Sequence, residues 1–288
     1  MQILANAIFL STFYLSFAAG LTIIFGVMRV VNYAHGEIFM VGGYVLFLTV
    51  ALFHGILPGP IVLFVALAIA VIAGCLLGTL IYFGLIAPLR EQPFSIFMAT
   101  LGLSYALQVG IIQIFGPVGR SVPVLIPGIL RFAGMILPTQ RIVVACLTLL
   151  MIALLWLVLN QTKIGRAIRA VSQNEIGAML QGIDLARIGL ATVLLGSALA
   201  ACAGVLMGSL LNVSPFMGGE AIWRAFIVII VGGIGSLPGA ALAAVIFGVL
   251  DSTLTAAGYG YSVALVDAVI MLAILSFRPN GLLGARDR

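Results

Sequence analysis

Ionisable side chains are rare in this chain, and six of them gather in one stretch. Asp, Glu, Lys and Arg make up 7% of the 288 residues. Residues 161–187, the polar island, hold Lys163, Arg166, Arg169, Glu175, Asp184 and Arg187. Apolar runs flank the island on both sides, each long enough to enter or cross a hydrocarbon core of about 30 Å. The island must therefore lie outside the bilayer, where its charges can bind a partner.

Apolar residues recur at helical spacing beside the basic residues of the island, which predicts short amphipathic helices. They are Ile164, Ile168 and Val171, followed by Ile176, Met179, Leu180 and Ile183. Such a helix can seat in the groove of a partner protein. It can equally lie on anionic lipid headgroups, attracted by Arg166 and Arg169. The island's residues alone do not decide between these two.

Side chains for catalysis are few. The chain has two histidines, His35 and His54, with no metal-ligand spacing, no GxSxG and no GxxxxGK[ST] phosphate-binding motif. Its three cysteines, Cys75, Cys146 and Cys202, lie in apolar runs and are expected to be buried small hydrophobes. We expect no enzyme activity, no metal and no cofactor in this chain.

Composition predicts an all-α polytopic membrane protein, because a hydrophobic share of 63% leaves too few polar residues to coat a soluble globule. The run at 222–233 would reach only about 18 Å, so it must be a half-helix, a re-entrant piece or a helix extended upstream through Glu220. Eight or nine spans are therefore expected. The longer runs lie near 5–28, 38–53, 61–87, 95–115, 141–160, 188–211, 238–256 and 261–277. The first lacks a preceding Lys or Arg and is expected to be a retained span, not a signal peptide.

Basic residues fall mostly on the same side as the island. Placing that side in the cytoplasm predicts an amino terminus outside and a carboxyl terminus inside. The net charge of +5 is explained by this orientation, so nucleic acid is not an expected partner. The outer segment 116–140 is broken by prolines and is expected to form short interfacial pieces that carry Arg120 and Arg131.

Two apolar segments are interrupted. The first break is GVMRVVNYAHGE at 26–37, and the second is GGIGSLPG at 232–239. Backbone freed at membrane depth must be packed in protein or line a wet cavity, so paired breaks point to a transport pathway. Tight turns between antiparallel helices, with glycines for close packing, are the alternative. The pathway candidates are Asn32, His35, Glu37, Gly232, Gly233, Ser236 and Pro238.

Few charges fall within the apolar spans. Glu220 and Arg224 have the i,i+4 spacing of an ion pair on one helix face. Asp251 and Asp267 fall in consecutive antiparallel spans, each a few residues from the turn between them, and are expected at similar depth. Each is either a functional ionisable group or a protonated or hydrogen-bonded carboxyl at the outer boundary.

Four stretches together resemble the permease subunits of bacterial branched-chain amino-acid ABC importers, the Liv-type family, and the H-type subunit in particular. They are GLTIIFGVMRVVNYAHGEIFMVGGY at 20–44, TKIGRAIRAVSQNEIGAMLQGID at 162–184, VGGIGSLPGA at 231–240 and FRPNGLLG at 277–284. The resemblance covers nearly the whole chain and implies one transmembrane permease domain over 1–288 with the ABC-importer permease fold. It implies import of leucine, isoleucine and valine across the bacterial inner membrane.

The resemblance also implies partners: a second homologous permease, two ATPase subunits that bind ATP and Mg, and an extracytoplasmic solute-binding protein. In ABC importers a cytoplasmic loop with an EAAxxxG-like pattern docks into the ATPase. Ala178 and Gly182 keep the last two fixed positions, Ile176 and Gly177 replace the first two, and Glu175 lies one residue early. The island is thereby identified as the coupling loop. Its coupling candidates are Arg166, Arg169, Glu175, Ala178, Gly182 and Asp184.

For a branched aliphatic zwitterion, the pathway candidates would offer passing hydrogen bonds between apolar walls. Arg120 or Arg131 would help to dock the binding protein on the outer face. Two alternatives stay open: a related permease for urea or short amides, and a secondary transporter or channel that acts without an ATPase. The first could share every motif above, whereas the second would transport as a single chain.

Overall fold

The computed structural model describes residues 2–132 and 135–284, and these residues form an all-α membrane protein with one small β-hairpin. Eight helices are long and apolar enough to span a bilayer, in agreement with the predicted eight or nine. They are α1 (Gln2–Met28), α2 (His35–Phe53), α3 (Gly59–Ile81) with a π-helical turn (Tyr82–Ile86), α4 (Pro93–Phe115), α5 (Thr139–Gln161), α8 (Leu185–Gly208), α10 (Leu237–Ala256), and α11 (Val263–Phe277) with a preceding 3-10 turn (Gly260–Ser262).

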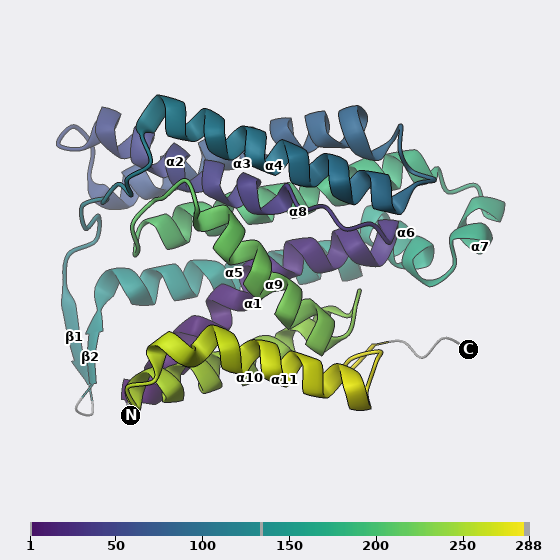
Figure 1. The fold of residues 1–288 in the computed structure, drawn as a ribbon. Coiled ribbons are helices and arrows are strands. Elements are labelled where there is room, and N and C mark those ends of the chain that lie inside the picture. The colour runs from purple at the N-terminus through teal and green to yellow at the C-terminus, as the bar shows by residue number, and fades with distance from the viewer. Residues whose placement is uncertain (1, 133–134, 285–288) are drawn as a thin grey trace.

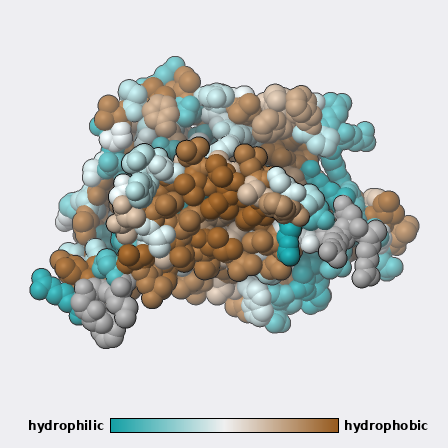
Figure 2. Space-filling view, turned by 60° about the horizontal axis from the view of Figure 1, so that its bottom comes forward, coloured by the Kyte–Doolittle hydropathy of each residue, from teal (hydrophilic) through white to brown (hydrophobic). Residues whose placement is uncertain are grey.

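Helices α1, α2 and α8 form the centre of the bundle, and the other long helices surround them (Figure 1). The α2–α8 contact depends on glycines: a Cβ on Gly42 would collide with the carbonyl oxygen of Ala201, and one on Gly204 with that of Phe39. Small residues let helix backbones approach closely in membranes, where packing replaces the hydrophobic effect. Outward-facing apolar side chains form a broad belt between two more polar ends (Figure 2).

The first predicted break is present. Helix α1 ends at Met28, and α2 begins at His35. Residues 29–34 between them are irregular and end in a turn at 33–34. The His35 ring packs on Phe17 at 5.3 Å between centroids, and a Cβ on Gly20 would lie 3.2 Å from His35 Nε2. The start of helix α2 therefore lies beside Gly20 of α1. Gly20 is eight residues before the end of α1 at Met28, about 12 Å at 1.5 Å per residue. The chain turns back into the bundle before it becomes helical again.

The second break separates α9 (Met217–Gly232) from α10. Helix α9 does extend upstream through Glu220, one of the three predicted possibilities, and its 16 residues reach about 24 Å, less than a full hydrocarbon core. The residues after α11 cap α9: the N–H groups of Leu282 and Leu283 donate to the carbonyls of Val231 and Gly232. The closing FRPNGLLG stretch thus satisfies helix-end groups that lipid could not.

Segment 116–140 contains no helix among its described residues between α4 and α5, as its prolines predict, and its short pieces include two β-strands. It forms a β-hairpin of β1 (Ile129–Phe132) and β2 (Met135–Pro138), paired antiparallel, and Arg120 exchanges both backbone hydrogen bonds with Val213. The prolines of this stretch disfavour a helix, and the hairpin instead pairs the backbone N–H and C=O groups of its two strands with each other. The hairpin and the start of α1 lie at one end of the bundle, and α6 (Lys163–Gln173) and α7 (Glu175–Leu180) at the other (Figure 1).

The cysteine prediction is only partly correct. Cys202 is buried and Cys75 is half-buried, but Cys146 is exposed. Cys146 lies on α5, an outer helix with most of its surface facing away from the bundle. An apolar run does not reveal which of its faces meets lipid and which meets protein.

Candidate functional site

The polar island folds as two short helices, each begun by a side-chain cap. The Thr162 hydroxyl accepts from the Gly165 N–H at 3.0 Å, and Asn174 Oδ1 accepts from the Gly177 N–H at 2.8 Å. Asp184 Oδ1 then accepts from the N–H groups of Ala186 and Arg187 and starts α8. These caps satisfy donors that a helix start leaves free. They explain why the two predicted apolar series lie on separate helices joined at a corner.

Helix α6 is anchored to the bundle. Ile168 and Val171 are buried in a cluster with Ile23 and Val27 of α1, so two of the three residues of the predicted apolar stripe face inward, whereas Ile164 is exposed. Gly165 lies so close to the end of α5 that a Cβ there would collide with backbone oxygens. A displacement of α6 must therefore displace α1 or α5 as well.

Helix α7 presents its apolar residues outward. Ile176, Met179 and Leu180 have exposed fractions of 67%, 48% and 81%. Large apolar side chains at this exposure, on a polar end of the molecule, are typical of an interaction surface. Among the coupling candidates, Ala178 is buried, whereas Arg166, Arg169, Glu175, Gly182 and Asp184 are exposed.

Glu175 is paired with Arg90, in the turn between the π-helical end of α3 and α4. The two residues line a hollow of about 410 Å³ beside Met28 and Val171. Arg90 was not among the predicted coupling residues. Its place on the same predicted side of the membrane as the island was the only sequence signal for it.

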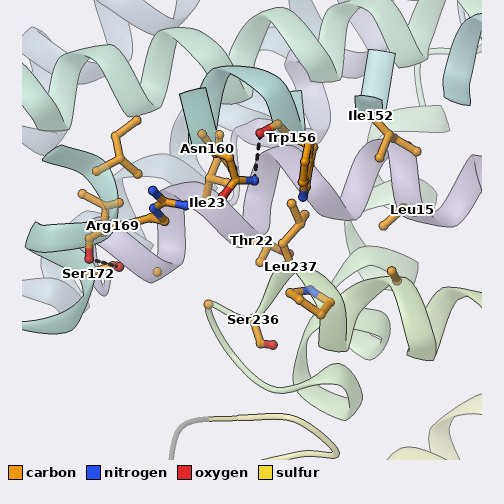
Figure 3. Close-up of a pocket in the computed structure, with 17 residues that line it drawn as sticks. Leu15, Thr22, Ile23, Ile152, Trp156, Asn160, Arg169, Ser172, Ser236 and Leu237 are labelled. Carbon is orange, nitrogen blue, oxygen red and sulfur yellow. Dashed lines mark hydrogen bonds between the residues drawn. The ribbon is translucent and has the colours of Figure 1, made fainter. Parts of the chain in front are cut away.

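The second break and the island meet in one cavity of about 450 Å³ (Figure 3). Ser236 and Pro238, predicted for the pathway, line it together with Arg169, predicted for coupling. Arg169 extends from α6 and hydrogen-bonds Asn160 at the end of α5. The structure therefore joins two candidate sets that the sequence analysis kept apart.

The polar residues of the first break lie elsewhere, inside the bundle. Asn32, His35 and Glu37 are at most 1% exposed. Glu37 Oε1 accepts from the Ser104 hydroxyl of α4 at 2.7 Å. The Asn32 amide, both His35 ring nitrogens and Glu37 Oε2 have no hydrogen-bond partner among the described residues. Buried polar groups are rarely left unpaired, so this cluster stays a candidate for the pathway.

Gly232 and Gly233 contribute close packing. A Cβ on Gly232 would meet the backbone of Gly239 at 2.5 Å, and one on Gly233 would collide with Gly284. Gly233 also has a φ of 107°, which an L side chain rarely adopts. For these two glycines the observed contacts are those of the close-packing alternative.

Arg224 does not pair with Glu220, contrary to the i,i+4 prediction. Its ion-pair partners in the described chain are Asp251 at 3.0 Å and Asp267 at 3.6 Å, and its guanidinium also donates to the Tyr14 hydroxyl at 2.8 Å. Both aspartates are buried, whereas Glu220 lies exposed on the surface of the chain. A buried carboxylate loses more than an exposed one when it has no cation, so burial decides the partner. One arginine thus ties α9 to α1, α10 and α11.

Arg120 and Arg131 are both exposed and lie in the segment that joins α4 to α5. The hairpin of that segment lies at the end of the bundle opposite the island (Figure 1). The Arg120 guanidinium donates to the Phe115 carbonyl at 2.6 Å, which holds it near the end of α4. Arg131 lies in β1. Their placement in this segment is compatible with the docking prediction, which no contact here tests.

Comparison with known proteins gives one consistent family. The family described as branched-chain amino acid transport system / permease component matches residues 3–275. The BraD high-affinity branched-chain amino acid transport system permease protein of Pseudomonas aeruginosa is 31% identical, covering 99% of this chain and 95% of BraD. The LivH permease protein of Escherichia coli K12 is 29% identical over the same shares. A probable LivH of Methanocaldococcus jannaschii is 30% identical, with 98% and 92% covered.

No solved structure matches the chain significantly. The full-length agreement with transport permeases fits the multi-pass helical bundle. This chain belongs to the permease-component family of branched-chain amino acid transport systems.

Proposed function

We propose that this chain is the H-type permease subunit of an ATP-driven importer that moves leucine, isoleucine and valine across the bacterial inner membrane. The full-length similarity to BraD and LivH, both branched-chain amino acid transport permeases, carries the proposal. Its amino terminus lies outside and its island inside, as the distribution of basic residues favours. The chain itself performs no catalysis; ATP and Mg bind to partner ATPases.

In this proposal α7 seats in a groove of one of two ATPase subunits. The exposed Ile176, Met179 and Leu180 supply its apolar contact, and the Arg90–Glu175 pair its polar border. Movement of α7 passes to α6 and, through the buried Ile168 and Val171, to α1. A second, homologous permease and an extracytoplasmic binding protein complete the importer. Coupling requires that the inward-open state and the outward-open state differ from each other in their contacts with the ATPase and with the binding protein.

The two breaks are the moving parts of the proposed pathway. Asn32, His35 and Glu37 offer hydrogen bonds to a passing zwitterion. Ser236 caps the start of α10 and Pro238 lies in its first turn, so both move with the second break. Selectivity would lie mainly in the binding protein, since the buried polar groups are few. A permease for urea or short amides would need the same parts and is the second candidate.

The test is uptake into proteoliposomes that contain this chain, its neighbouring permease and ATPases, and the binding protein. ATP-dependent uptake of labelled leucine, absent for urea and lost with Leu180→Glu, is expected; Leu180→Met is the matched control because it keeps an apolar side chain. Uptake by this chain without an ATPase would replace the proposal with a secondary transporter. Preferred uptake of urea would replace the substrate and leave the coupling role intact.

A further inference from the structure

The cavity beside the second break is a groove along α1, with α5 on one side and α10 on the other (Figure 3). Its floor runs from Leu15 to Gly26, about 16 Å at 1.5 Å per residue. Helix α6 closes one end with Arg169 and Ser172. The groove is therefore long, narrow and blocked at the island.

Its polarity changes along its length. Toward Leu15 and Ile152 the walls are aliphatic, and Trp156 lies between them and the polar end. At the closed end lie four side chains with hydrogen-bonding groups: Asn160, Arg169, Ser172 and Ser236. Arg169 extends into this end from α6, and Ser236 lies across from it (Figure 3). A ligand that fits must be apolar for most of its length and polar at one tip.

Both walls belong to the apolar belt. Trp156 is 53% exposed, and neighbouring Leu149, Leu157, Leu242 and Val245 are also exposed. Tryptophan near the end of a membrane span is typical of the level where acyl chains meet headgroups. The groove is therefore reached from the lipid phase, and its polar end lies at headgroup level.

The polar end is cationic. Arg169 is the only ionisable side chain among the described residues that line the groove, and Lys163 and Arg166 lie on the same helix. A guanidinium that lines a groove together with two serine hydroxyls is suited to a phosphate group, which accepts charge-assisted hydrogen bonds from it. We propose that the groove binds one anionic phospholipid, with an acyl chain along Leu15, Ile152 and Trp156 and its phosphate beside Arg169.

A lipid in this position touches the island and the second break at once. Its phosphate contacts α6, and its glycerol region lies against Ser236 and Pro238, where α10 begins. The bound lipid therefore stabilises one relative position of α6 and α10. The site does not depend on which solute the chain transports.

The chain has two tryptophans, Trp156 and Trp223, so Trp223→Phe leaves a single fluorophore in the groove. The full-length variant is placed in vesicles with equimolar phosphatidylglycerol and phosphatidylcholine, and brominated acyl chains, which quench indole fluorescence, are carried by either lipid in turn. We expect about a fivefold preference for phosphatidylglycerol at Trp156, as one arginine near a lipid headgroup supplies. Bulk lipid alone would quench equally from both.

Two pairs of variants locate the effect. Arg169→Gln should remove the preference, whereas Arg166→Gln, which removes the same charge outside the groove, should keep it. Ala241→Phe, which fills the groove, should also remove it, whereas Val249→Phe, at an exposed position further along α10, should not. These pairs separate binding in the groove from general attraction of the basic helix.

Four results would overturn the proposal. The first is equal quenching by the two brominated lipids, and the second is a preference that survives Arg169→Gln. The third is loss of lipid quenching when the second permease is assembled with this chain, since a protein surface would then occupy the groove. Loss of the preference on adding inorganic phosphate would also count against it, because a free ion would then be the ligand.

Discussion

Gly26 of α1 and Gly235 of the second break touch backbone to backbone: a Cβ on Gly26 would lie 3.1 Å from the Gly235 Cα. The start of the first break thus rests on the middle of the second break. Since α1 also carries the buried side of α6, this contact connects the island to both breaks. A shift of the island has a direct mechanical route to the proposed pathway.

Gly26→Leu should weaken that contact. The neighbouring backbone cannot yield easily, so we expect a cost of about 1–3 kcal/mol in stability, typical of overpacking, and a larger loss of uptake than of expression. Thermal unfolding in detergent and leucine uptake measure the two effects. Gly102→Leu on α4 is the control, because nothing lies within 4 Å of a Cβ there. Equal behaviour of the two variants would refute a role for the contact.

Arg224→Met should destabilise the fold, because it leaves two buried carboxylates without their cation. Removing one partner of a buried pair costs about 3–5 kcal/mol, and the lower end applies here because Arg224 is 36% exposed. Glu220→Gln should change stability by less than about 0.5 kcal/mol. Thermal melts of the purified chain decide between these partners: a greater loss with Glu220→Gln would restore the i,i+4 pair.

Adding Asp251→Asn to Arg224→Met should recover part of the lost stability, since one buried charge is then removed. No recovery would mean that Arg224 acts through packing on the Tyr14 ring, over which its guanidinium lies at 5.5 Å.

Glu175→Lys should abolish co-purification of the ATPase while the chain stays in the membrane. The Arg90–Glu175 pair is about half exposed, so its loss costs at most about 1 kcal/mol of folding stability. The double variant Arg90→Glu, Glu175→Lys restores the pair with reversed charge. Recovery of binding in the double variant would show that Glu175 acts through Arg90; continued loss would show that the ATPase contacts Glu175 itself.

Gly182→Asp should likewise abolish ATPase binding and uptake. Nothing lies within 4 Å of a Cβ at this position, so the fold has room for the side chain. Gly182 has a φ of 79°, which Asn and Asp tolerate better than other residues. Gly182→Asn, neutral and of the same shape, is the control for backbone strain. Equal loss in both variants would assign the effect to strain, and normal uptake with Gly182→Asp would refute docking at this corner.

Arg120→Glu with Arg131→Glu should reduce stimulation of the ATPase by the binding protein. Both side chains are exposed, so reversing their charge should slow association with an acidic surface. Loss of the exposed hydrogen bond from Arg120 to the Phe115 carbonyl should lower the melting temperature only slightly. The measurement is ATP hydrolysis by the reconstituted complex as binding protein is added. Stimulation equal to that of the unchanged complex would exclude these arginines from docking.

The sequence by itself determined the spans, the two breaks and the position of the island. Each depends on a local property: a long apolar run must lie in lipid, and a cluster of six charges cannot. For 222–233 the sequence excluded a full span by length and left three forms open, of which the structure shows the helix extended upstream through Glu220.

Only the tertiary structure decided which distant residues meet. Helical spacing compares neighbours along one helix, so it favoured Glu220 for Arg224, whereas burial of Asp251 and Asp267 made them the actual partners. The sequence could not reveal that Arg90 reaches Glu175 or that Arg169 and Ser236 line the same cavity. These contacts join segments far apart in the chain, and their energies depend on burial and close approach, which exist only once the helices pack.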